Sequence, residues 1–76
     1  MGCSILLLHQ VGGGCPDLLI GRAGKRGRVN LLVEVKDGSR PPSERVLTPE
    51  QIRFRREWRG QVAVVSTMDE LIALLQ

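Results

Sequence analysis

Two acids and a lysine lie in or beside apolar runs that are typical of β-strands. Asp17 directly precedes the run at residues 18–20, while the run at residues 31–36 contains Glu34 and Lys36. Because side chains alternate between the two faces of a strand, Glu34 and Lys36 are predicted to share one face. Carboxylates can hold a divalent cation beside a phosphodiester, and a lysine can offset charge on phosphoryl oxygens. These residue types therefore indicate metal-dependent phosphodiester hydrolysis.

The two acids are predicted to meet because residues 22–28 contain two glycines suited to a chain reversal. A hairpin there would place Asp17 beside Glu34. Both strands are apolar on both faces, which predicts a sheet covered on each side, where paired acids are costly without a cation. Magnesium takes oxygen ligands and needs only one or two carboxylates, so we predict Asp17, Glu34 and the Val35 carbonyl as ligands. The alternative is a solvated surface ion pair, the commoner role of Glu-x-Lys on a strand.

A helix with a strong start signal is predicted over residues 49–59. Thr48 suits the N-cap, a proline follows at the first helical position, and Gln51 at the third completes a capping-box pattern. Gln51, Phe54 and Trp58 follow at steps of three and four, so this stripe is predicted to face the sheet. Gln51 is then either a capping residue or a group that orients water or substrate. With almost no exposed aromatics to stack bases, sequence-specific recognition of single strands is not expected.

Four motifs occur in the order Gly-Gly-Gly-Cys-Pro-Asp-Leu-Leu, Leu-Leu-Val-Glu-Val-Lys-Asp-Gly, Leu-Thr-Pro-Glu-Gln and Trp-Arg-Gly-Gln-Val-Ala-Val-Val. Their order resembles the VRR-NUC branch of the PD-(D/E)XK nucleases, in the small stand-alone form of phages and bacteria. The resemblance implies a Mg²⁺- or Mn²⁺-dependent phosphodiesterase that acts on DNA, often on flaps or four-way junctions. It also implies that Asp17 and Glu34 bind metal, that Lys36 is the catalytic lysine, and that Gln51 is the glutamine that follows on a helix.

The chain departs from this family at its N-terminal side. Relatives usually begin with a helix that carries a further glutamate, whereas only eight residues precede His9 here. We therefore expect residues 1–76 to form a single VRR-NUC-like nuclease domain without that helix. The chain is then a truncated form, a nuclease with fewer ligands, or a catalytically impaired module for DNA binding or assembly on the same fold.

The remaining segments predict a mixed α/β fold, a small restriction-endonuclease-like core in the order strand, strand, strand, helix, strand, helix. We expect a core strand over residues 4–10, a short buried strand over 61–65 and a final helix over 68–75. That helix follows a second capping-box pattern that begins at Thr67. Residues 37–46 are polar and contain two prolines, so they are predicted to form a loop beside the site.

The formal net charge is +3, but the basic residues are clustered in the reversal and on the first predicted helix. Arginine and lysine contacts to phosphate supply salt-dependent affinity without reading sequence. The alternative is that both groups are only solvated. The predicted DNA contacts are Arg22, Lys25, Arg26, Arg28, Arg40, Arg53 and Arg56.

The small size of the chain predicts help from a partner. A domain of about 60 residues buries only about 60% of its unfolded surface, and this one is little larger at 76 residues. Two cysteines and one histidine offer neither a disulfide framework nor a structural zinc site, so a homodimer is expected. The apolar run at residues 5–8 is too short for a signal-peptide core or a membrane span. We therefore expect a location in the cytoplasm of a bacterium or a phage-infected cell.

Overall fold

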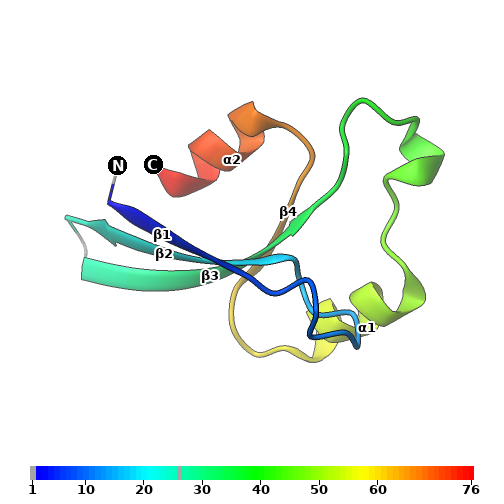
Figure 1. Cartoon of the computed structure of the whole chain (residues 1–76), viewed down its shortest axis with the longest axis horizontal. Coiled ribbons are helices and arrows are strands. Elements are labelled where there is room, and N and C mark those ends of the chain that lie inside the picture. The colour runs from blue at the N-terminus through cyan, green and yellow to red at the C-terminus, as the bar shows by residue number, and fades with distance from the viewer. Residues whose placement is uncertain (1, 26) are drawn as a thin grey trace.

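The computed structural model describes residues 2–25 and 27–76 and contains a four-stranded mixed sheet in the order β1-β2-β3-β4 (Figure 1). The predicted α/β class and the order of strands and helices are confirmed. Residues 37–46, predicted to form a loop, also contain a short 3-10 helix, η1. The strands are β1 (Cys3–Leu7), β2 (Leu18–Gly24), β3 (Gly27–Val35) and β4 (Val62–Val65), and the helices are η1 (Pro42–Glu44), α1 (Pro49–Glu57) and α2 (Met68–Leu75).

β2 and β3 form a long antiparallel hairpin that brings distant residues into register. Leu18 pairs with Val33 at one end, and Gly24 pairs with Gly27 at the turn. The prediction that residues 22–28 form a connecting segment is wrong for most of its length, because both strands continue to the turn. Gly27 has φ +100°, a conformation that side chains disfavour, so the turn itself does need a glycine.

β1 is an edge strand and pairs only with β2, in antiparallel fashion, whereas β4 pairs in parallel with β3. The predicted core strand over residues 4–10 is wrong in extent, because β1 ends at Leu7. It is also wrong in burial, since Ile5, Leu6 and Leu7 are 61%, 57% and 63% exposed. The leucines of α2 pack against residues of β2, β3 and β4, which leaves residues 5–7 of β1 uncovered. β4 begins at Val62, one residue later than expected.

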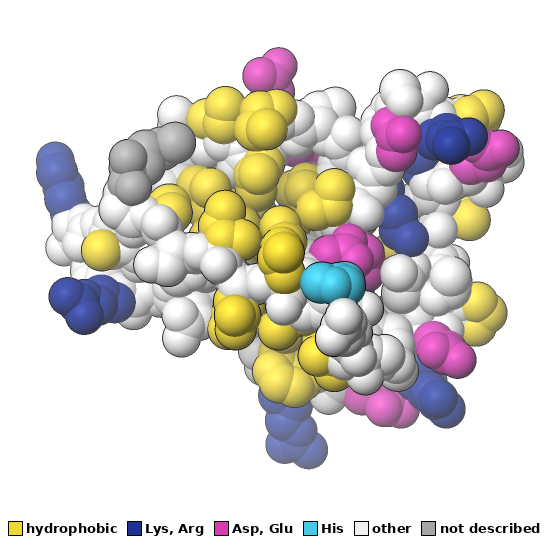
Figure 2. Space-filling view, in the orientation of Figure 1, with side chains coloured by type: hydrophobic (Ala, Val, Ile, Leu, Met, Phe, Trp, Pro, Cys, Tyr) yellow, Lys and Arg dark blue, Asp and Glu magenta, His cyan; other side chains and the backbone are white. Residues whose placement is uncertain are grey.

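α2 covers one face of the sheet and builds the apolar core with it. Ile20 and Val33 are completely buried, Val65 is nearly so, and leucines 71, 74 and 75 of α2 pack against them. Hydrophobic side chains gather in the middle of this side of the molecule, over the strands and α2 (Figure 2). The predicted bounds of α2 are confirmed. Within the described residues, no helix combines the length and apolar character needed to cross a membrane.

α1 lies on the opposite side of the sheet from α2 (Figure 1). Strand alternation directs Glu34 away from the face that carries Val33, and Gln51 of α1 hydrogen-bonds Glu34 there. Pro16, Phe54 and two valines of β4 line a small space between α1 and the sheet. The expectation of a sheet with a helix on each side is therefore confirmed, although β1 is left exposed.

α1 ends at Glu57 rather than at residue 59. Trp58 already has extended backbone angles, with φ −71° and ψ 125°, and its side chain is 49% exposed. The predicted inward stripe therefore holds for Gln51 and Phe54, which are half-buried, and is wrong for Trp58. Phe54 is the last member of the stripe to lie in a full helical turn, which is why the spacing rule fails after it.

Candidate active site

The two acids predicted to bind metal lie side by side. Because Leu18 pairs with Val33, Asp17 and Glu34 occupy the next opposed positions of the hairpin. The Asp17 Oδ2 atom accepts a hydrogen bond of 2.9 Å from the Val35 N–H, which fixes this carboxylate at the end of β3. Glu34 is only 4% exposed, while Asp17 is half-buried. The predicted convergence of the two acids is confirmed.

This arrangement makes the charged form of Glu34 unfavourable. Burial raises the pKa of Glu34 to about 7, and the hydrogen bond and negative charge of Asp17 add to the effect, while the Lys36 ammonium opposes it. A buried carboxyl group beside a second acid binds its proton more tightly, and a nearby cation favours its ionised form. The pair is therefore an electrostatic site for a positive charge.

Gln51 joins the acid pair to the lysine. Its Oε1 accepts a 2.8 Å hydrogen bond from Lys36 Nζ, and its Nε2 donates a 3.0 Å bond to Glu34 Oε1. Glu34 and Lys36 therefore do share one face of the sheet, as their spacing predicts. The Lys36 N–H also donates to the Val65 carbonyl at 2.8 Å, which continues the β3–β4 pairing by one residue and fixes the lysine backbone.

The capping box of α1 holds the Gln51 amide in one orientation. Oε1 also accepts from the Thr48 N–H at 2.9 Å, and Thr48 Oγ1 accepts from the Gln51 N–H at 3.2 Å. A flipped amide would direct its NH₂ group at two donors and its oxygen at a carboxylate, so only one orientation satisfies all partners. The two roles considered for Gln51 are therefore combined, since one side chain caps the helix and contacts both charged residues.

The Gly-rich loop before Asp17 packs directly against the start of α1. Gly14 has φ +78°, and a Cβ atom there would collide with the Glu50 carbonyl, so a larger residue would separate the loop from the helix. The loop also carries Cys15, which was not among the predicted site residues. Burial, Glu34 and Asp17 together raise the pKa of the Cys15 thiol, which keeps it protonated beside the acids. Its position two residues before Asp17 was the available sequence signal.

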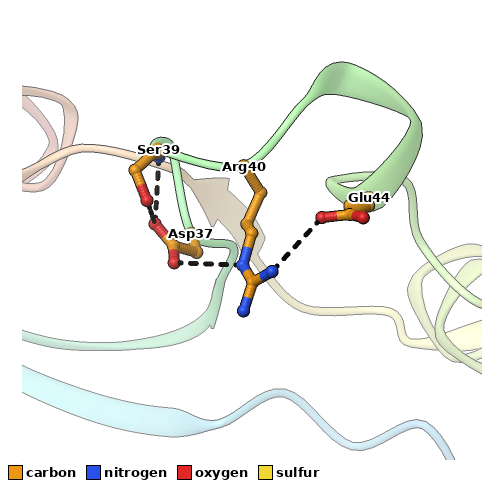
Figure 3. Close-up of polar contacts among 4 residues, drawn as sticks. All are labelled: Asp37, Ser39, Arg40 and Glu44. Carbon is orange, nitrogen blue, oxygen red and sulfur yellow. Dashed lines mark hydrogen bonds and ion pairs between the residues drawn. The ribbon is translucent and has the colours of Figure 1, made fainter.

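Two of the arginines predicted to contact DNA form contacts within the protein. Arg22 donates to the backbone oxygens of Leu75 and Gln76 at 3.1 and 2.8 Å, which ties β2 to the end of α2. Arg40 lies 3.7 Å from Asp37 and 3.6 Å from Glu44, and Asp37 also accepts hydrogen bonds from Ser39 (Figure 3). These bonds from Ser39 lower the pKa of Asp37. The ion pairs of Arg40 are exposed and contribute little stability, but they hold the loop after β3 in a local turn.

The other predicted DNA contacts divide by distance from the acids. Lys25 and Arg28 are exposed at the hairpin turn, about 20 Å from Asp17 at ~3.3 Å per strand residue. Arg53 and Arg56 are exposed on α1, within two turns of Gln51. Arg26 lies outside the described residues. Arg45 was not predicted, yet its Nε is buried without a hydrogen-bond partner among the described residues, so it has an unmet need for an acceptor.

The two carboxylates suit Mg²⁺ better than a metal that needs three or more ligands from the protein. Within residues 2–25 and 27–76, no cluster of three or more His, Cys, Asp or Glu side chains is placed to hold a metal. The Asp17–Glu34 pair is thus the candidate site, and two carboxylates suffice for Mg²⁺, which retains several waters. The Val35 N–H is used by Asp17, while the Val35 carbonyl as a third ligand stays a prediction.

Comparison of the chain with protein-family models, curated proteins and solved structures found no match. The resemblance to VRR-NUC nucleases therefore rests on the order of the motifs.

Proposed function

We propose that the chain is a Mg²⁺- or Mn²⁺-dependent nuclease that hydrolyses phosphodiester bonds in DNA. The observation that carries the proposal is the hydrogen-bonded chain from Lys36 through Gln51 to Glu34, with Asp17 beside it. An isolated Glu-x-Lys pair on a solvated strand has no need of a buried acid or of a bridging amide. Here a nearly buried glutamate, a second acid and a lysine converge on one point, which is the composition that metal-assisted hydrolysis uses.

Each residue has a distinct task in this proposal. Asp17 and Glu34 would hold the cation, which when bound polarises the phosphate and lowers the pKa of a bound water. Lys36 places its ammonium beside the acids, where it stabilises negative charge that develops on the phosphoryl oxygens. Gln51 uses one of the three Lys36 donors and leaves two for water or phosphate. It therefore sets the position of the ammonium without neutralising its charge.

The substrate is proposed to be branched DNA, held by its backbone. The exposed arginines of α1 lie close to the acids and the exposed hairpin turn lies about 20 Å away, so a bound duplex arm would span both. A homodimer in the cytoplasm is part of the same proposal. The homodimer is supported by β1, because three consecutive large apolar residues of this edge strand are more than half exposed.

A second candidate is a catalytically impaired DNA-binding or assembly module. The observation that favours it is the small donor set, because within the described residues only two carboxylates converge and no third acid joins them. Such a module would bind branched DNA with the same arginines but would not cut it.

The experiment that tests the proposal is cleavage of labelled linear, flap and four-way-junction DNA with Mg²⁺, with Mn²⁺ and with chelator. Lys36→Ala should lower the metal-dependent rate by about 10²-fold or more, in line with loss of one preorganised charge-stabilising group. Lys25→Ala is the comparison, because Lys25 is the only other lysine of the chain: as a proposed DNA contact at the distant turn, it should weaken DNA binding and leave the rate at saturating DNA unchanged. Full activity in Lys36→Ala would contradict the mechanism, and tight binding without cutting by the unaltered chain would favour the module.

A further inference from the structure

Trp58 presents an indole to solvent just beyond the end of α1. Its side chain is 49% exposed, although it is the only tryptophan of the chain and was expected to face the sheet. A large exposed aromatic side chain is a common feature of binding surfaces, because it offers contact area at low cost in side-chain entropy. Nothing in the proposed cleavage chemistry uses this residue.

The indole is held in place on two sides. Its ring is stacked on Phe54, with the ring centroids 5.3 Å apart and the planes inclined by 13°. Phe54 in turn lines the small space between α1 and the sheet, together with Pro16 and Glu34. Gly60 lies against the indole nitrogen, since a Cβ atom there would come within 2.8 Å of Nε1. The exposed ring is thus preorganised, and a ligand that stacks on it need not order it.

The surroundings of the indole are basic. Four arginines on and just after α1 are exposed, and among the described residues none of them forms an ion pair. One of them, Arg59, follows Trp58 directly in the sequence. Exposed guanidinium groups next to an aromatic face are complementary to a nucleic-acid strand, whose phosphates and bases alternate along the chain. The four are Arg53, Arg55, Arg56 and Arg59.

We propose that Trp58 is a stacking platform for an unpaired nucleobase, and that the arginines of α1 bind the phosphates of the same strand. Bases inside a duplex already stack on both faces, so the platform selects a single-stranded segment. Gln51 and Trp58 are seven residues apart, about 10 Å along the axis of α1, so the platform lies within a few nucleotides of the acid pair. The inference rests on the proposed function only for the source of that strand, the unpaired arm of a branched substrate.

Intrinsic fluorescence tests the platform directly, because the chain has one tryptophan and no tyrosine. Lys36→Ala protein in chelator would be titrated with flap DNA and with blunt duplex of equal length, while the anisotropy of labelled DNA reports occupancy. We expect the flap, and not the duplex, to quench the emission, because only the flap offers an unpaired base. Unchanged emission at saturating flap DNA would overturn the inference. Emission that instead depends on protein concentration alone would place the indole in a contact between copies of the chain, and would also overturn it.

Variants of Trp58 and Ile52 distinguish stacking of a base on the indole from loss of any exposed side chain on this part of the surface. Trp58→Ala should weaken binding of flap DNA about 5-fold or more and leave binding of blunt duplex unchanged, while Trp58→Phe should retain part of the preference. Ile52→Ala is the matched control, since Ile52 is 50% exposed on the same helix but has no ring to stack. Equal losses in Trp58→Ala and Ile52→Ala would contradict the platform. Flap-dependent quenching by a chain that never cuts DNA would contradict the nuclease and leave the platform standing.

Discussion

The two helices begin in the same way and end up with different tasks. Thr48 and Thr67 are both N-caps, and the hydroxyl of each accepts a hydrogen bond from the backbone N–H three residues later, at 3.2 and 3.1 Å. In α1 that residue is Gln51, whose side chain continues to Lys36 and Glu34. In α2 it is Glu70, whose carboxylate contacts only the local turn in the hydrogen bonds of the described residues.

The difference lies in the face of the sheet that each helix covers. α2 packs its leucines on the apolar face, so its cap serves stability. α1 begins over the charged ends of β2 and β3, so its cap is part of the hydrogen-bond network of the site. A capping motif therefore acquires a functional role from its position in the fold and not from its own sequence.

The largest expected difference in cleavage rate is between variants at the third residue of each helix, Gln51 in α1 and Glu70 in α2. Gln51→Ala removes the group that positions Lys36 and leaves Glu34 without its donor, so cleavage should fall by about 10²-fold. Glu70→Ala should cost about 1 kcal/mol of stability and leave the cleavage rate of the folded protein unchanged. Steady-state cleavage of flap DNA by both variants, with circular dichroism as a check on folding, makes the comparison. Equal losses of activity would remove the distinction between the helices.

Gln51 also marks how far the sequence could predict the site. The meeting of Asp17 with Glu34, the shared face of Glu34 and Lys36 and the cap at Thr48 follow from local rules of alternation, turns and capping, and the structure confirms them. The bond from Gln51 to both charges was left open, because it depends on where α1 docks.

The features that the sequence did not predict have the same origin. Arg22 reaches the end of α2, more than 50 residues away along the chain, and no local pattern predicts such a contact. Trp58 follows the helical spacing in the sequence, but the helix has ended one residue before it. Ile5 to Leu7 are apolar enough for a core, yet their strand lies at the edge of the sheet.

The pH dependence of stability should come from the face that α1 covers. The folded state holds the Glu34 proton with a pKa of about 7. An unfolded chain would hold it with a pKa of about 4.3. The metal-free protein should therefore lose stability as the pH rises from about 4.3 through about 7. Urea unfolding across this range should show the loss, and Glu34→Gln should abolish it. Glu70→Gln, the matched change at the start of α2, should keep it, and a pH profile that follows Glu70 instead would refute the assignment.

The smallest expected difference in cleavage rate is between variants of the two N-cap threonines. Thr48→Val and Thr67→Val should each cost about 1 kcal/mol of stability, because each removes one cap. Only Thr48→Val should also slow cleavage, by several-fold, since the Gln51 amide loses part of its anchorage. The change should appear in kcat and not in KM, because the arginines proposed to bind phosphate are untouched. Slower cleavage in both variants to the same degree would mean that the rate follows stability alone.

The central claim is that Asp17 and Glu34 form a site for a divalent cation, and calorimetric titration with Mn²⁺ at pH 7.5 tests it most directly. We expect one ion per chain, with release of the fraction of a proton that Glu34 still holds at this pH, and loss of binding in Asp17→Asn. Asp69→Asn, an exposed change in the first turn of α2, should bind as the unaltered chain does. Binding that survives Asp17→Asn, or no binding by the unaltered chain, would contradict the account.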